Sequence, residues 1–369
     1  MKTQVLLASV CLLLGACSKP AAPLAVATPE TLKAHSAEFK KEVLTPAPGV
    51  HVAIGYGIAN SILIEGDDGA LLVDTTESLE AGREVAAAFA KLTSKPVKAI
   101  IYTHSHPDHV QGAAAFIPAG ATVPIYAQED VAANMDKIAS ELQPVITRRS
   151  LRMYGYGLSP DELLNVGIGP NVDIHEGTTL GILRPTKTFR DTLDDTVAGI
   201  RFTLVHAPGE TEDQIFVWLP DRKILLPGDN IYRAFPNLYT IRGTGYRDPK
   251  RWAASLDKMR HLGAELVVPS HTRPISGKAE GARPALEVLA RDVLAAMTYK
   301  PADIIHVNAG RLKIGAPADL TLIDLAREWT VDPKQFSSKS QQASNSRRAS
   351  PLGTASKREW PATTCKRTK

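Results

Sequence analysis

Residues 103–109 read Thr103-His104-Ser105-His106-Pro107-Asp108-His109, which places three of the ten histidines within six positions. The preceding residues 97–102 are rich in β-branched side chains and predict a buried strand. Alternate side chains of an extended segment point the same way, so His104 and His106 would face one side. Pro107 suits the first turn of a helix that would carry Asp108 and His109. Imidazole and carboxylate are ligands that suit zinc. The cluster therefore predicts a metal site at a strand end, with a satisfied polar turn as the alternative.

Three later segments also place a side chain that can bind a metal directly after a predicted strand. Glu210, Asp229 and His271 follow the strands expected at residues 200–206, 223–226 and 265–269, respectively. Asp229 alone would be an ordinary turn residue. Together with the first cluster, these side chains favour a site for two metal ions.

This pattern resembles the metallo-β-lactamase superfamily, whose HxHxDH signature stands at residues 104–109. The resemblance implies an α/β fold, an αββα sandwich over residues 47–283 with a C-terminal appendage. It implies two Zn²⁺ per chain and a metal-activated water. It assigns His104, His106 and Glu210 to one zinc, Asp108, His109 and His271 to the other, and Asp229 to a bridging position, with Asp108 also catalytic. Asp74 either supports the ligand loop or simply ends its strand.

Within that superfamily the chain resembles the alkyl sulfatases. Lactamases and thioester hydrolases usually carry His where Glu210 stands. The similarity extends over residues 227–243, Arg247-Asp248-Pro249, Trp252, Gly55-Tyr56, Asn60-Ser61 and Met153-Tyr154-Gly155. It implies that Asn237 and Arg242 bind the sulfate group, with Tyr154 as a further substrate-binding residue, whereas Asp229 departs from the Glu common in that family.

The resemblance thus implies a zinc-dependent hydrolase of alkyl sulfate esters. An arginine offers two parallel donors to an oxyanion, which suits a sulfate monoester. One alternative is another hydrolase of the same fold, such as a β-lactamase. The other is a truncated, inactive lipoprotein that binds metal without turnover.

The N-terminus looks like an export signal of a lipoprotein. Lys2 precedes an apolar run, and residues 14–17 resemble a lipobox that ends at Cys17. About ten apolar residues are too few to span a bilayer. We therefore expect a signal peptide at residues 1–16, a lipid on Cys17 and a tether at residues 17–46, rich in Ala, Pro and Thr. This arrangement would place the protein in a bacterial envelope, on the periplasmic face of the outer membrane.

The C-terminal part departs from the alkyl sulfatases. Residues 284–340 resemble the end of a dihydroorotase-type amidohydrolase without its catalytic barrel. Dimerisation is expected to be weak, because the family's dimer region is not recognisable. Residues 341–369 form a basic tail that accounts for the net charge of +4, and their Ser and Gln content favours a disordered end over contact with nucleic acid or anionic lipid.

The composition of 44% hydrophobic and 22% charged residues is that of a globular protein. We expect a hairpin at residues 61–74, a helix at residues 77–92 capped by Ser78, and helices at residues 110–116 and 128–142. Residues 149–169 are rich in glycine and aromatic residues and lack periodicity. They indicate either a surface loop or a substrate wall near the metals.

Overall fold

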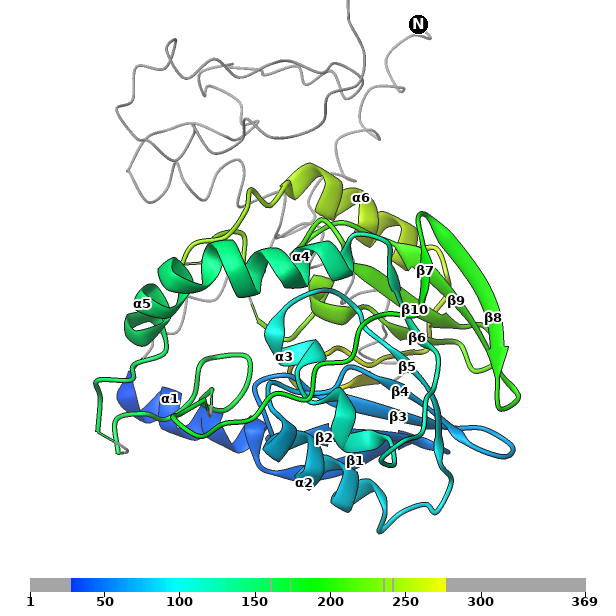
Figure 1. The fold of residues 1–369 in the computed structure, drawn as a ribbon. Helices are drawn as coiled ribbons and strands as arrows, with labels where there is room; N and C mark the ends of the chain where they lie inside the picture. Colours follow the sequence, from blue (N-terminus) through cyan, green and yellow to red (C-terminus); the bar gives the residue numbers. More distant parts are fainter. Residues whose placement is uncertain (1–27, 160, 173, 235, 241, 277–369) are drawn as a thin grey trace, which may run out of the picture. The chain divides into compact units, whose positions relative to one another are not determined.

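The computed structural model describes residues 28–276 apart from residues 160, 173, 235 and 241. In this part of the chain, two β-sheets lie face to face with helices on their outer sides (Figure 1). None of the helices described there is long and apolar enough to cross a lipid bilayer. The predicted signal peptide, the lipidation site Cys17, the amidohydrolase-like segment at residues 284–340 and the basic tail lie outside the described residues.

The first sheet has seven strands in the order β1-β2-β3-β4-β5-β6-β7. They are β1 (Glu42–Ala47), β2 (Val50–Ile54), β3 (Ser61–Glu65), β4 (Ala70–Val73), β5 (Val97–Ile101), β6 (Ile125–Gln128) and β7 (Lys187–Phe189). Strands β1 to β4 pair antiparallel, and β4 to β7 pair parallel. The hairpin predicted at residues 61–74 is confirmed as β3 and β4.

The second sheet has six strands in the order β13-β12-β11-β10-β9-β8. They are β8 (Thr192–Val197), β9 (Ile200–His206), β10 (Ile215–Leu219), β11 (Ile224–Leu226), β12 (Leu266–Val267) and β13 (Ile275–Ser276). All neighbours pair antiparallel except β11 and β12, which are parallel. The strands expected before Glu210, Asp229 and His271 are confirmed, whereas β7 and β8 were not predicted.

Three layers of apolar side chains hold the sandwich together. The central layer joins the inner faces of both sheets, for example Ile62 of β3 and Phe202 of β9. The opposite face of the first sheet packs on helix α2 (Leu79–Phe89) through Val85 and Phe89. The outer face of the second sheet packs on helix α6 (Pro249–Arg260) through the buried Trp252. This order of layers confirms the predicted αββα sandwich (Figure 1).

The two covering helices begin at capping side chains. Ser78 accepts a hydrogen bond from Ala81 N at the start of α2, as predicted. Asp248 accepts from Lys250 N and Arg251 N, and Pro249 occupies the first turn of α6. These caps fix the loops before each helix, and both loops lead to the site described below.

The helices between β5 and β7 differ from the prediction. The helix expected at residues 110–116 is two short pieces, α3 (Pro107–Val110) and the 3₁₀ turn η2 (Ala113–Phe116). The helix expected at residues 128–142 begins only at α4 (Val131–Lys137) and continues through a π-helical turn, η3 (Ile138–Leu142), into α5 (Gln143–Met153). Helix α5 was not predicted, because none of its residues is fully buried and only Ile146, Ser150 and Met153 are partly buried, which gives a weak apolar stripe.

The predicted tether is wrong for its second half. Residues 29–46 contain helix α1 (Pro29–His35), the turn η1 (Ser36–Phe39) and most of β1. Strand β1 pairs with β2, and Phe39 is buried. The low apolar content of this segment concealed these elements, since β1 lies at the edge of the sheet with its side chains only partly buried.

Candidate metal centre

The first histidine cluster lies where β5 ends and α3 begins. Thr103 to Ser105 form a bend after β5, His106 is extended, and α3 starts at Pro107. The rings of His104 and His106 are 4.5 Å apart between centroids, and those of His104 and His109 are 4.1 Å apart. The strand end and the short helix therefore bring the three imidazoles together, as the sequence predicted.

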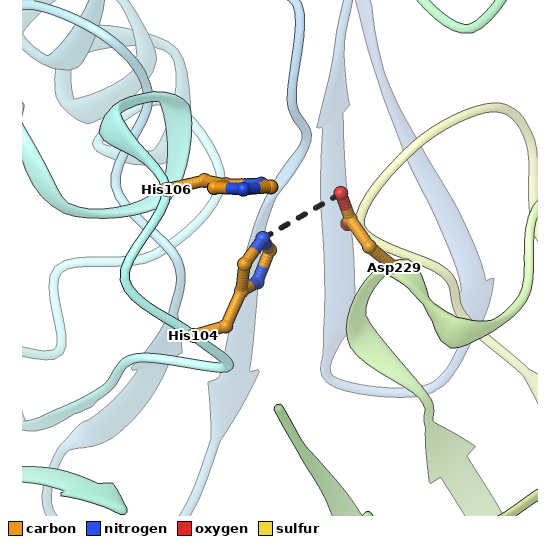
Figure 2. Close-up of side chains that lie close together, drawn as sticks. All are labelled: His104, His106 and Asp229. Carbon is orange, nitrogen blue, oxygen red and sulfur yellow. Dashed lines mark ion pairs between the residues drawn. The ribbon is translucent and has the colours of Figure 1, made fainter. Parts of the chain in front are cut away.

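Two groups of side chains could each hold a metal ion. One comprises His104, His106 and Asp229, and the other comprises Asp108, His109 and His271; within each, the ligand atoms lie within 4.8 Å of one another. Figure 2 shows the first group, with Asp229 on the turn η4 (Gly228–Asn230) facing the two imidazoles. Asp229 Oδ2 is also 3.4 Å from His109 Nε2 and 3.0 Å from His271 Nε2. This carboxylate therefore lies near both groups, and its bridging role between two metals stays a prediction.

Several of these buried atoms have no hydrogen-bond partner within the described part of the chain. They are His104 Nε2, His109 Nε2, Asp229 Oδ1 and Glu210 Oε2. Buried polar atoms normally have partners, and an unpaired one costs free energy. Imidazole nitrogens and carboxylate oxygens are the donors that zinc accepts, so this donor set fits a divalent metal.

The ligands are held from behind by a second layer of hydrogen bonds. Asp74 accepts from His109 Nδ1 at 2.8 Å, from Thr103 N at 2.9 Å and from Ser270 Oγ at 2.7 Å. The carbonyl of Ile58 can only accept, so His271 Nδ1, at 2.8 Å, carries the proton there. Both contacts direct Nε2 of the ring toward the centre, where His109 Nε2 has no hydrogen-bond partner among the described residues and His271 Nε2 lies 3.0 Å from Asp229 Oδ2. Of the two roles considered for Asp74, the structure shows the support of the ligand loop.

Burial and neighbouring charges determine the ionisation of the cluster. Burial lowers the pKa of His104 to about 4 and holds the pKa of His106 well below its usual value. Burial also opposes charge on His271, but Asp229 outweighs it and raises the pKa of His271 to about 9. Burial likewise lowers the pKa of His109, but Asp229 and Asp108 together outweigh it and raise that pKa, so that protons on the two histidines offset the charge of the carboxylates in the protein alone. A divalent cation would replace those protons.

Glu210 lies beside the two groups but belongs to neither. Asp229, and not Glu210, lies within 4.8 Å of the ligand atoms of both His104 and His106, and the assignment of Glu210 to that zinc stays a prediction. Burial raises the pKa of Glu210 to about 7, an effect that Arg247 opposes. Glu210 Oε1 forms an ion pair with Arg247 Nη1 at 2.7 Å, and its Oε2 has no hydrogen-bond partner among the described residues.

A cavity of about 650 Å³ opens over this centre. The predicted substrate-binding residues Tyr154, Asn237 and Arg242 all line it, together with the candidate ligands His106, Asp108, Glu210, Asp229 and His271. Much of the remaining lining is apolar and comes from the last residue of α5 and the segment after it: Met153, Leu158, Leu163, Leu164, Val166 and Ile168. Of the two readings of residues 149–169, the structure therefore shows the wall near the metal site.

The sequence analysis missed three contributors to the site. Arg247 was noted only as part of a family motif. Glu77 is buried and accepts Ile58 N at 3.2 Å with each carboxylate oxygen, which steadies the peptide that binds His271. Leu32 of α1 lines the cavity. Glu77 stands three residues after Asp74 in the sequence, and this proximity could have indicated that Glu77 also supports the site.

Comparisons with known proteins agree with this geometry. Residues 54–271 match the metallo-beta-lactamase superfamily. A linear primary-alkylsulfatase of Pseudomonas sp. (strain ATCC 19151) is 42% identical over 223 residues, which cover 58% of this chain and 42% of that protein. An (R)-specific secondary-alkylsulfatase of Pseudomonas sp. is 26% identical over 305 residues, 76% of this chain and 44% of that protein. The chain thus spans less than half the length of these relatives.

The chain is also similar to a solved alkylsulfatase structure and, over a short segment, to a dihydroorotase. The stereoselective inverting sec-alkylsulfatase Pisa1 from Pseudomonas sp. shares the fold, with a TM-score of 0.65 at 24% identity over 72% of this chain and 43% of that one. A dihydroorotase of Ehrlichia canis (strain Jake) is 57% identical over 49 residues, 13% of this chain and 11% of that protein, which confirms the resemblance predicted for a short segment. Since the superfamily match covers more than half of the chain, the protein belongs to the metallo-β-lactamase superfamily.

Proposed function

We propose that this protein is a hydrolase of alkyl sulfate esters that uses two zinc ions. The observation that carries the proposal is the composition of the cavity. The cavity wall contains residues of two metal-ligand groups, the cationic Arg242 and a run of apolar side chains. An alkyl sulfate has matching parts, a singly charged oxyanion and a hydrocarbon chain. The names of the relatives, linear primary and secondary alkylsulfatases, support the same substrate class.

The two zinc ions would be held by different sets of side chains. His104, His106 and Asp229 would hold one zinc, with Glu210 beside them, and Asp108, His109 and His271 would hold the other. The bound metals supply the activation of a water molecule at neutral pH. Asp74 and Ile58 keep the ligand histidines in the correct tautomer.

The substrate groups would be bound from the cavity lining. Arg242 can donate two parallel hydrogen bonds to sulfate oxygens, and Asn237 adds a neutral donor. Burial raises the pKa of Tyr154, which lies next to Arg242, so its hydroxyl keeps the proton and can donate to the bound ester. The apolar lining would stabilise the alkyl chain by about 0.8 kcal/mol for each buried methylene group.

Parallel assays of the purified protein test this function. Metal analysis should find about two zinc ions per chain. The protein should then release inorganic sulfate from dodecyl sulfate and leave a cephalosporin intact. Turnover of the cephalosporin alone would indicate a β-lactamase instead. A metal-replete protein that hydrolyses no ester would favour a binding lipoprotein.

We further propose that the mature protein is acylated at Cys17 and held at the periplasmic face of a bacterial outer membrane. The lipobox-like residues 14–17 support this location. Replacing Cys17 by Ser should release the protein from the membrane fraction or block its processing. Wild-type protein recovered in the cytoplasm with Met1 intact would refute the proposal.

A further inference from the structure

Arg247 forms a buried ion pair that the reaction outlined above does not use. Its side chain is 1% exposed, and its Nη1 lies 2.7 Å from Glu210 Oε1. Nη1 also donates to the backbone carbonyl of Asn237. Placing a guanidinium in the protein interior costs several kcal/mol unless it is paired. The fold therefore retains a costly charge at this position, and its partner is a candidate metal ligand.

The ion pair with Arg247 leaves one carboxylate oxygen of Glu210 available to bind a metal. Oε1 is taken by Arg247, whereas Oε2 is buried with no hydrogen-bond partner among the described residues. The main chain of Glu210 is fixed independently, because its N–H donates to Asn230 Oδ1 at 3.2 Å. The side chain of Asn230 is itself held by Ala207 O at 2.7 Å. With the backbone fixed, the side-chain torsions of Glu210 are the remaining freedom, and the ion pair with Arg247 restrains them.

Arg247 is itself anchored by a rigid element. The next residue, Asp248, caps α6, and Trp252 on that helix is fully buried and donates to Asn230 O at 3.1 Å. Glu210 is thus held by a hydrogen bond to Asn230, and Arg247 precedes helix α6, whose Trp252 is bonded to the same Asn230. The distance between their side chains is set by packed structure rather than by a flexible loop.

Arg242, five residues earlier, has a different environment. It lines the cavity, is only partly buried, and its Nη1 contacts Gly243 O at 3.2 Å. Arg247 is not among the lining residues of that cavity. The first arginine can therefore reach a substrate, whereas the second contacts the site from behind, through Glu210 and the backbone carbonyl of Asn237.

We propose that Arg247 is a positioning residue that holds the Glu210 carboxylate so that Oε2 serves as the ligand of the zinc bound by His104 and His106. It also balances the additional negative charge that a carboxylate introduces at this ligand position. The inference rests on the proposed two-zinc function and deepens it. Removal of such a supporting group typically weakens metal binding or activity by about 10–100-fold.

The test measures zinc affinity by competition with a chromophoric chelator, alongside kcat and KM on a short alkyl sulfate. Arg247→Met should weaken one of the two zinc sites about 10–100-fold and leave the other unchanged. It should lower kcat with little change in KM. Arg247→Lys should recover part of the affinity, since an ammonium can still pair with Oε1. The matched control Arg242→Met should keep both zinc ions and raise KM instead.

A double-mutant cycle shows whether Arg247 acts through Glu210. Glu210→Gln alone should weaken the same zinc site, and adding Arg247→Lys or Arg247→Met should then cost little more. Additive losses, or an Arg247→Met protein with normal zinc binding and a raised KM, would overturn the inference. The Lys variant keeps the cycle usable if the Met variant fails to fold.

The affinity measurement also separates this inference from the proposed function. A wild-type protein that binds two zinc ions but releases no sulfate would contradict the function alone, and the cycle would still test Arg247. A wild-type protein without zinc affinity would overturn the function and the inference together, before any variant is made.

Discussion

The floor and the wall of the cavity are built in different ways. The metal floor consists of His104, His106, Asp108, His109, Asp229 and His271, and the apolar wall consists of Met153, Leu158, Leu163, Leu164, Val166 and Ile168. Floor residues follow strand ends and are mostly buried, and several are held by hydrogen bonds from neighbouring elements. Apart from Met153 at the end of α5, the wall is irregular chain, and Leu158 is 53% exposed. We infer that the floor sets the chemistry, whereas the wall can change with the substrate.

The largest effect is expected from the floor. His106→Ala should remove most of the bound metal and all hydrolysis, because His106 is one of the three side chains that form its metal-ligand group. Metal analysis of the purified variant measures this directly. His261→Ala, an exposed histidine outside the cavity, is the matched control and should keep both metals. Retention of both metals by the His106 variant would show that the floor is assigned wrongly.

Arg242 lies where floor and wall meet, so its loss should affect the substrate and not the metals. Arg242→Ala should lower kcat/KM for alkyl sulfates about 10²-fold, equivalent to about 2.7 kcal/mol, while the zinc content stays constant. Arg242→Lys should recover only part, because an ammonium lacks the bidentate fork. Near-normal efficiency on alkyl sulfates would refute the role. Equal losses on uncharged esters would indicate a purely structural one.

Asp74 tests whether the floor depends on its support. Asp74→Asn keeps the shape and tolerates the positive φ of 58° at this position, but its amide nitrogen cannot accept a hydrogen bond. Zinc affinity should fall about 10–100-fold at the site that contains His109. Chelator competition measures this change, with the exposed Asp68→Asn as the control. An unchanged affinity would show that His109 is held without Asp74.

The wall should give the smallest effect. Leu163→Ala should raise KM for dodecyl sulfate roughly threefold to tenfold and leave short esters nearly unaffected, since each buried methylene contributes about 0.8 kcal/mol and the wall is partly exposed. A chain-length series of alkyl sulfates measures this. Leu92→Ala, 49% exposed and outside the cavity, should change nothing. A uniform loss over all chain lengths would place Leu163 in the floor's supporting structure.

The same contrast explains how far the sequence could predict the molecule. The floor was predictable because its ligands follow strands with continuous apolar runs, such as β5, and because imidazole and carboxylate side chains have few other roles in such clusters. The wall was left open between two readings, because irregular chain has no periodicity to interpret. The contact between Glu210 and Arg247 depends on tertiary packing of β9 and α6, which no local pattern records.

The N-terminal helix has a practical consequence for work on this protein. Leu32 of α1 lines the cavity, Asn165 Nδ2 donates to Leu32 O at 3.0 Å, and Ser36 Oγ donates to Leu164 O at 3.3 Å. A recombinant variant shortened to begin after residue 36 would keep every metal ligand and could hydrolyse small esters at a normal rate. It would nevertheless lose one side of the compartment that receives the hydrocarbon chain. Chain-length selectivity measured on such a variant would therefore describe the shortened protein and not the native one.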